Sequence, residues 1–164
     1  MKVEIIKKNE LNRIQKIAFE TWPDTFKHIL SKEQINYMIG WMYSLEMLSK
    51  NIDDGHLFFI CSKDGHDIGF IGIQPLEINL FTLKIHKIYI LPSFQRMGVG
   101  KKLMNKAVYM ANIYKCKFLL LNVNRFNNAV LFYQKYGFEI IEEENIDIGN
   151  GFLMEDFVMR KLLI

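Results

Sequence analysis

The chain has 164 residues, of which 50% are hydrophobic and 24% charged, and a formal net charge of +3. This length fits one domain with a sizeable core, so we expect a single domain over residues 1–164. The small, scattered positive charge does not indicate nucleic-acid binding. The first ten residues lack a secretory signal, and no apolar run approaches the roughly 18 residues of a membrane span. We therefore expect a cytoplasmic protein that does not contact membranes.

The two cysteines, Cys61 and Cys116, are far apart in the sequence. They lack the spacing of a zinc site or of a paired disulfide framework. Buried free thiols are the simpler interpretation, because cysteine is among the most buried residue types. The sequence thus predicts no metal centre.

Residues 3–6 predict a strand, and two helices are expected to follow it. Their apolar positions at helical spacing are Leu11, Ile14, Ile17, Ala18 and Thr21 for the first, and Ile35, Met38, Ile39, Met42 and Leu45 for the second. The first helix is expected to end at Trp22-Pro23, since the residue before a proline disfavours helical geometry. Ser31 and Gln34 resemble a capping box that starts the second helix.

Three strands are expected next, at 57–61, 68–74 and 81–91. The first two flank Lys63-Asp64-Gly65, and an Asp-Gly pair favours a tight hairpin. The third run is rich in β-branched and aromatic residues and ends at Pro92.

The second half of the chain continues with alternating elements. They are a helix that starts at Val99, a strand at 117–123 that reads as buried on both faces, a short helix AVLFYQKY closed by Gly137, and strands at about 138–148 and 152–162. The predicted order is β-α-α-β-β-β-α-β-α-β-β. We therefore expect an α/β fold with a mixed sheet and helices on its faces.

The turn QRMGVGKK at 95–102 joins a strand to a helix through two glycines. The first helical N–H groups are unpaired and the helix dipole is positive there, so the turn can bind an anion such as phosphate. A plain turn whose glycines relieve backbone strain is the alternative. A nucleotide-triphosphate loop is excluded because Gln95 replaces its first glycine, and a dinucleotide fingerprint lacks its third glycine at Leu103.

The spacing that does fit is Q-x-x-G-x-G, after a strand that ends in IYILP. It resembles the acetyl-coenzyme A loop of the GNAT superfamily of N-acetyltransferases. The block NVNRFNNAVLFYQKYGFE at 122–139 resembles the family's second motif, and the predicted element order matches the family fold over almost the whole chain.

The resemblance implies that acetyl-coenzyme A is a co-substrate, with no metal. Its pantetheine arm would pair with the backbone of Ile88, Tyr89 and Ile90, where the fourth and fifth strands splay apart and expose an N–H group for the thioester oxygen. Its diphosphate would lie on the amides of Arg96, Met97, Gly98, Val99, Gly100 and Lys101.

Tyr133 aligns with the tyrosine that resembling enzymes place near the coenzyme sulfur as general acid. Its neighbours Phe132 and Tyr136, four apart on one helix face, are expected in the core. Asn127 aligns with an asparagine that holds the coenzyme arm, although a helix cap suits it as well. The spacing departs from the family by one residue here, so Asn124 and Asn128 compete for that role.

The general base is open in the sequence. Some relatives carry a glutamate where this chain has Asn122, and an asparagine accepts no proton usefully. Others use a glutamate close to the position of His86, whose imidazole is one candidate base. A structural histidine on a strand and a water relay are the alternatives.

The family builds its acceptor pocket from segments that correspond here to TWPDTFKHIL, INYMIGWMYS and IDIGNGFLMEDF. Aromatic and methionine side chains in the first two segments either line that pocket or form core: Trp22, Phe26, Tyr37, Trp41, Met42 and Tyr43. The end segments resemble spermidine and spermine acetyltransferases, which implies a small, polyamine-like amine acceptor. A protein amine acceptor and a non-catalytic acyl-coenzyme A sensor are the alternatives, and a homodimer is open because family members are often dimers.

Overall fold

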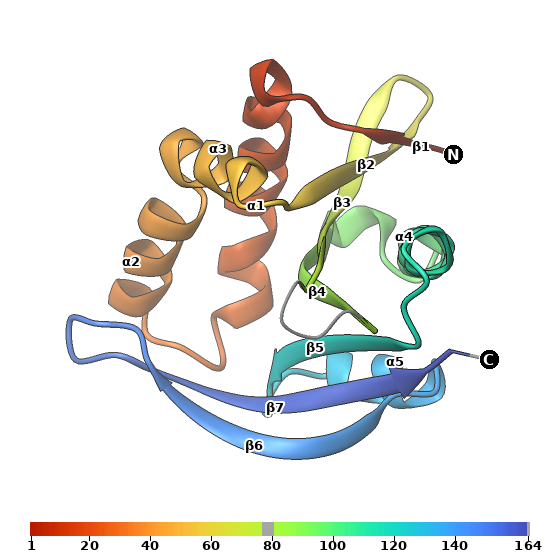
Figure 1. Cartoon of the computed structure of the whole chain (residues 1–164). Helices are drawn as coiled ribbons and strands as arrows, with labels where there is room; N and C mark the ends of the chain where they lie inside the picture. The colour runs from red at the N-terminus through yellow and green to blue at the C-terminus, as the bar shows by residue number, and fades with distance from the viewer. Residues whose placement is uncertain (77–80, 164) are drawn as a thin grey trace.

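A computed structural model describes residues 1–76 and 81–163, and it shows a mixed β-sheet with helices on both faces (Figure 1). The elements are β1 (Lys2–Ile5), α1 (Leu11–Phe26), α2 (Lys32–Met42), α3 (Leu45–Asp53), β2 (Leu57–Lys63), β3 (His66–Pro75), β4 (Thr82–Ile90), α4 (Val99–Ile113), β5 (Phe118–Asn124), α5 (Ala129–Lys135), β6 (Glu139–Asp147) and β7 (Leu153–Leu162). Helices α1, α2 and α3 cover one face, and α4 and α5 cover the other (Figure 1). The prediction of a mixed sheet between helices is confirmed.

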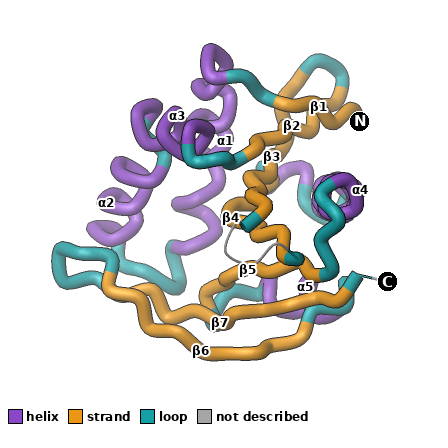
Figure 2. The backbone as a smooth tube through the Cα atoms, in the orientation of Figure 1, coloured by secondary structure: helices purple, strands orange, loops and turns teal. Residues whose placement is uncertain are grey.

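The seven strands are ordered β1-β2-β3-β4-β5-β7-β6. Neighbours pair antiparallel except β4 and β5, which run parallel because α4 carries the chain back across the sheet (Figure 2). The β2–β3 hairpin turns at Asp64 and Gly65, which both have positive φ, as the Asp-Gly pair predicted. None of the helices among the described residues combines the length and hydropathy that crossing a bilayer requires.

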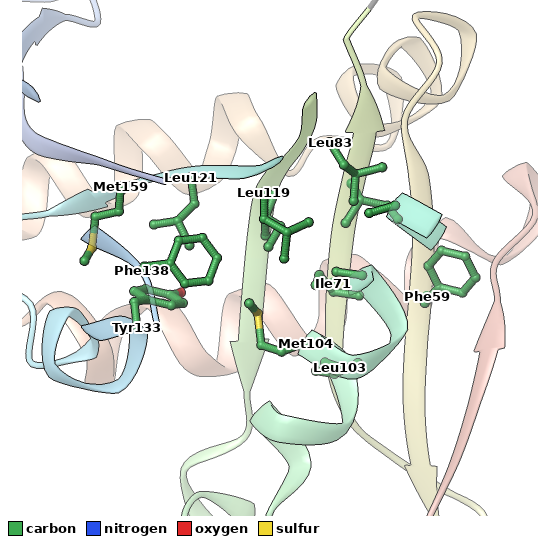
Figure 3. Close-up of a cluster of buried hydrophobic side chains, with 14 of the residues drawn as sticks. Phe59, Ile71, Leu83, Leu103, Met104, Leu119, Leu121, Tyr133, Phe138 and Met159 are labelled. Carbon is green, nitrogen blue, oxygen red and sulfur yellow. The ribbon is translucent and has the colours of Figure 1, made fainter. Parts of the chain in front are cut away.

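Two apolar cores lie on opposite faces of the sheet. The α4-side core contains Phe59, Ile71, Leu83, Leu103, Met104, Leu119, Leu121, Tyr133, Phe138 and Met159 among its members (Figure 3). The α1-side core contains Ile14, Trp22, Phe26, Met38, Tyr43, Phe58 and Phe70 among its members. Burial of this apolar surface is the main favourable contribution to folding, and it fixes the sheet between its helices.

Helix α1 does not end at Pro23, as the sequence analysis expected, but continues to Phe26. Proline lacks the N–H group that would bond the Phe19 carbonyl, at a cost of up to about 3 kcal/mol in a helix interior. Trp22 and Phe26 flank the proline and are 1% and 3% exposed. Their packing into the core on this face of the sheet outweighs the local preference of the proline.

The single second helix expected up to Leu45 is two helices, so the chain has one helix more than the predicted order. Ser44 lies between α2 and α3, and its hydroxyl caps α3 by accepting a hydrogen bond from Met47 N–H at 3.1 Å. Leu45 is therefore the first residue of α3, with 48% of its surface exposed, and not the end of the α2 stripe. Ser44, a favoured N-cap residue within the run of apolar positions, indicates in the sequence that one helix ends and another begins here.

Strand β5 is buried fully on only one face. Leu119, Leu121 and Val123 pack into the α4-side core, whereas Phe118, Leu120 and Asn122 on the other face are partly exposed. The prediction of burial on both faces is wrong for Phe118, Leu120 and Asn122, whereas Asn124 at the end of the same face is buried.

Candidate active site

Strands β4 and β5 part from each other partway along their length. Their parallel pairing runs from Thr82 opposite Phe118 to Ile85 opposite Leu121. β4 then continues to Ile90 and β5 to Asn124 without further pairing between them. One edge of β4 is thus left without a strand partner among the described residues, in the middle of a sheet. We call this opening the β4–β5 gap.

The backbone groups that face the gap belong to Ile88 and Ile90. Leu91 N–H bonds the Ile68 carbonyl on β3, and these residues lie directly opposite each other in the antiparallel register. In such a ladder, hydrogen-bonded and non-hydrogen-bonded pairs alternate. Tyr89 therefore turns its backbone toward β3, whereas Ile88 and Ile90 turn theirs toward the gap.

His86 occupies a bulge on β4. Lys87 lies opposite Gly72 and Ile85 lies opposite Ile73, so His86 has no counterpart on β3. A bulge bends its strand and increases the local twist. This bend lies where the pairing with β5 ends, which accounts for the divergence of the two strands.

The loop after β4 presents consecutive amides at the start of α4. None of the N–H groups of Arg96 to Lys101 has a hydrogen-bond acceptor among the described residues, and the first helical bond joins Lys102 N–H to the Gly98 carbonyl at 3.0 Å. The first turn of α4 contains no acidic residue. Free amides at a helix N-terminus bind anions, so the loop fits a diphosphate.

Both glycines of the loop also have structural reasons. Gly98 is the N-cap of α4 and has a φ of 82°, a conformation that costs other residues about 1–2 kcal/mol. A Cβ on Gly100 would lie 3.2 Å from Ile90 Cδ1 and 3.4 Å from Phe132 Cζ. The strain-relief interpretation is thus compatible with anion binding, because the same conformation exposes the amides.

The basic residues around the loop differ in what they contact. Arg96 and Lys101 have exposed side chains with no recorded partner among the described residues. Lys102 Nζ instead bonds the Met1 carbonyl at 2.5 Å. Met97 is exposed and Val99 is buried in the α4-side core, so both can serve an anion only through their backbone.

Tyr133 lies in the α4-side core, 7% exposed, with its ring centroid 5.8 Å from that of Phe138 (Figure 3). Burial raises the pKa of its hydroxyl, which keeps the proton in place at neutral pH. The hydroxyl has no hydrogen-bond partner among the described residues, yet it is not one of their fully buried unpaired polar atoms. Phe132, expected in the core, is 37% exposed, because Tyr133 takes the inward position of this short helix.

The three competing asparagines are now separated by their contacts. Asn127 Oδ1 accepts from Ala129 N–H at 2.9 Å, and Asn124 Oδ1 accepts from Phe126 N–H at 3.0 Å. Asn128 is exposed. Asn128 is the N-cap residue of α5, and Asn127 just before it accepts from the first helical N–H group, while its side-chain NH₂ group has no hydrogen-bond partner among the described residues.

His86 lies in an environment that does not suit a general base. Its Nε2 is 2.9 Å from Gln74 Oε1, and its ring stacks on His56 with centroids 4.2 Å apart. Burial lowers the pKa of His86 to about 3, and the nearby His56 and Lys84 lower it further. An imidazole of that pKa takes a proton from an ammonium group poorly.

A carboxylate that the sequence analysis did not single out as catalytic lies beside the gap. Asp156 on β7 is 6% exposed and lies opposite Asn124 of β5 and Glu144 of β6. Burial raises its pKa to about 6. The sequence contains one indication of this burial: Asp156 alternates with Met154 and Val158, so the three side chains lie on the same face of the strand.

The tip of the β6–β7 hairpin is held against α2 (Figure 1). Tyr37 donates its hydroxyl to the Ile148 carbonyl at 2.9 Å, and Gln34 Nε2 bonds the Leu153 carbonyl at 2.8 Å. Of the aromatic residues expected to line a pocket, Trp22, Phe26 and Tyr43 are buried core, and Trp41 is 45% exposed. Tyr37 is therefore the aromatic residue that joins the two expected pocket segments.

Comparison with known proteins identifies the family. Residues 54–140 match the family described as Acetyltransferase (GNAT) domain. The chain is 31% identical over 163 residues to a spermidine N(1)-acetyltransferase of Thermoplasma acidophilum, covering 94% of this chain and 97% of that protein. It is 28% identical over 119 residues to the [ribosomal protein bS18]-alanine N-acetyltransferase of Haemophilus influenzae, covering 71% of this chain and 77% of that protein.

The fold comparison agrees. The crystal structure of the PaiA N-acetyltransferase from Thermoplasma acidophilum, in complex with coenzyme A, superposes with a TM-score of 0.82 at 27% identity, covering 99% of this chain and all of that one. The resemblance to the GNAT superfamily is confirmed, and so is the prediction that the chain is an N-acetyltransferase. The chain belongs to the GNAT acetyltransferase family.

Proposed function

We propose that the protein transfers an acetyl group from acetyl-coenzyme A to a primary amine of a small, polyamine-like molecule. The observation that carries this proposal is the combination of an unpaired β4 edge with six free amides directly after the strand. An extended amide-bearing chain that ends in a diphosphate complements both features. The similarity to a structure that contains coenzyme A supports the same donor.

The proposed donor contacts follow from the directions of these groups. The backbone of Ile88 and Ile90 would bond the pantetheine arm, because it faces the gap. The amides of Arg96, Met97, Gly98, Val99, Gly100 and Lys101 would hold the diphosphate. Asn127 would add its side-chain amide. Tyr89 would contribute its ring on the α1 side of the sheet, since its backbone is directed to β3.

In the proposed reaction, the neutral acceptor amine attacks the thioester carbonyl carbon. A backbone N–H group of β4 in the gap stabilises the developing oxyanion. The C–N bond forms, the C–S bond breaks, and Tyr133 gives its proton to the departing thiolate. The proton that the new amide nitrogen loses restores the tyrosine, directly or through water. The raised pKa of Tyr133 keeps its phenol protonated at neutral pH, so that a proton is present when the thiolate departs.

Two features support a small amine as acceptor. Docking of the β6–β7 hairpin on α2 through Tyr37 and Gln34 joins two of the segments expected to line the acceptor pocket, which suits a compact acceptor better than a folded protein. The Thermoplasma relative is named for spermidine, whereas the Haemophilus relative is named for an alanine of a ribosomal protein. The first of these relatives spans nearly all of this chain, including the hairpin.

The test is to mix the protein with acetyl-coenzyme A and a panel of amines and to follow the free thiol. The panel contains spermidine, spermine, monoamines and a peptide with an N-terminal alanine. We expect thiol release above the hydrolysis background with a polyamine and little with the peptide. Preference for the peptide would contradict the small-amine acceptor. Coenzyme binding without thiol release from any amine would favour a non-catalytic sensor.

A further inference from the structure

Asp156 carries one carboxylate oxygen that is buried and has no hydrogen-bond partner among the described residues. It lies in the middle of β7, is 6% exposed, and its Oδ1 is fully buried with no hydrogen bond among the described residues. A buried carboxylate without compensation costs several kcal/mol, so an uncompensated oxygen at such a position requires an explanation.

Two polar side chains near Asp156, Asn122 and Arg125, make hydrogen bonds or ion pairs to other groups. Asn122 Nδ2 donates to Glu144 Oε2 at 2.8 Å. Arg125 bonds Glu143 at 2.8 Å and also contacts Asn145 and Glu155. Among residues 1–76 and 81–163, no cation neutralises Asp156 by direct contact.

The charges that face Asp156 come from three elements. The nearby side-chain amide of Asn122, Arg125 after β5 and Lys84 of β4 lower its pKa, whereas Glu144 of β6 raises it. Burial is the largest effect, and the resulting pKa is about 6. The group is thus ionised at neutral pH and can take up a proton just below it.

Asp156 and Tyr133 lie on opposite sides of the β4–β5 gap. Met154, two residues from Asp156 on the same strand face, packs against the α1-side core, whereas Tyr133 belongs to the α4-side core. Burial raises the pKa of Tyr89, and the nearby Tyr43, Tyr133 and Asp156 raise it further. Tyr133 and Asp156 thus belong to opposite faces of the sheet.

We propose that Asp156 is the catalytic residue that receives the ammonium group of the acceptor and removes its proton. This inference rests on the proposed function and deepens it. A cationic amine supplies the partner that Oδ1 lacks, and the side chain lies on the sheet face where the acceptor would enter. The ammonium N–H bond breaks, its electron pair stays on nitrogen for attack on the thioester, and the proton passes to the Asp156 carboxylate. Water takes that proton after product release.

The residues of β5 that lie beside Asp156 carry amides and not carboxylates. Asn122 lies on the same strand face as Asn124, which is directly opposite Asp156. In that non-hydrogen-bonded pair the side chains lie close together. The carboxylate of Asp156 is thus on β7, the strand next to β5. Asn122 of β5 donates a hydrogen bond to Glu144 of β6.

The experiment compares the wild type with Asp156→Asn, Asp156→Ala and the matched control Glu155→Gln. Glu155 is the adjacent carboxylate of β7, and 49% of its side chain is exposed. The measurements are kcat/KM for spermidine against pH, the Kd of coenzyme A, and the titration of the Asp156 carboxyl by ¹³C NMR with and without spermidine. Folding of each variant is checked by its thermal unfolding.

We expect Asp156→Asn to lower kcat/KM by about 10²-fold or more, as loss of a general base does, and to change the Kd of coenzyme A less than about twofold. The wild-type profile should fall below pH about 6, and that limb should be absent in Asp156→Asn. Glu155→Gln should retain it. The NMR titration should show spermidine lowering the pKa of Asp156.

The outcomes separate the two proposals. If Asp156→Asn acetylates spermidine with wild-type kcat/KM and an unchanged pH profile, the role of Asp156 is overturned and the proposed function stands. If the wild type acetylates no amine but spermidine still lowers the Asp156 pKa, the amine site is supported and the proposed function falls. If spermidine leaves the Asp156 pKa unchanged and is still acetylated, Asp156 does not contact the acceptor.

Discussion

Ile85 and Leu121 form the last pair of the parallel ladder that joins β4 to β5. The bulge at His86 follows on β4, and from there the two strands diverge. The groups assigned to the proposed reaction lie around this point: the backbone of Ile88 and Ile90 that faces the gap, Tyr133 from α5, and Asp156 from β7. A single register irregularity thus opens the sheet between the α4-side and α1-side cores.

The coenzyme loop is tested by Gly98→Asp with Gly65→Asp as its matched control. Both glycines have positive φ, of 82° and 79°, and a Cβ at either would meet nothing within 4 Å. Both substitutions should lower the free energy of unfolding similarly, by about 1–2 kcal/mol. Only Gly98→Asp places a negative charge at the free amides, so its Kd for coenzyme A should rise by about tenfold or more in a calorimetric titration. Equal affinities of the two variants would contradict the loop assignment.

The general acid is tested by Tyr133→Phe, with Tyr136→Phe as the control on the same helix. The Tyr136 hydroxyl bonds Asn105 at 2.7 Å, whereas that of Tyr133 has no partner among the described residues. Tyr133→Phe should lower kcat by about 10²–10⁴-fold with a nearly unchanged Kd for coenzyme A, because only the donated proton is lost. Tyr136→Phe should change kcat little. A Tyr133→Phe enzyme with wild-type kcat would remove this tyrosine from the mechanism.

The features that the sequence predicted and the structure shows are those encoded locally. The glycines of the loop, the hairpin at Asp64-Gly65 and the tyrosine of the short helix are all defined by spacing within one turn or motif. The conformation of each feature depends on residues that are adjacent in the sequence, so the residue types and their spacing are enough to predict it. The family resemblance then supplied their order around the coenzyme.

The parts that the sequence did not predict depend on tertiary neighbours. Asp156 reads as a surface carboxylate until its strand partners Asn124 and Glu144 are known, and their pairing spans 32 and 12 residues of sequence. Pro23 was expected to end α1 because the packing of Trp22 and Phe26 is not visible locally. For His86, the strand pattern gave no indication of its stacking on His56, which lies 30 residues earlier.

The free energy of unfolding should reveal Asp156 independently of activity. Its pKa is raised from 3.8 to about 6, so the native state binds the proton more tightly than the unfolded state does. Stability should therefore fall as pH rises from about 4 to 6, by up to about 3 kcal/mol, and stay lower above it.

The substitution Asp156→Asn should remove this loss of stability at higher pH, because an asparagine does not ionise. Urea unfolding at pH 4 and pH 8 should show the variant close to wild type at pH 4 and more stable at pH 8, whereas Glu155→Gln should follow the wild type at both. A variant that loses stability equally at both pH values would show that the carboxylate has a native partner.

The docking of the β6–β7 hairpin on α2 is tested by Tyr37→Phe. This change removes the hydrogen bond to the Ile148 carbonyl, which contributes about 0.5–1.5 kcal/mol. Gly149 permits the contact, since a Cβ there would lie 2.9 Å from the Tyr37 hydroxyl oxygen. We expect faster hydrogen exchange of the hairpin-tip amides and a KM for spermidine that rises up to about tenfold, with a smaller change in kcat, because the loss affects acceptor enclosure and not proton transfer. Tyr109→Phe is the control, since Tyr109 is 57% exposed on α4, and a similar rise in KM there would contradict a role for the hairpin.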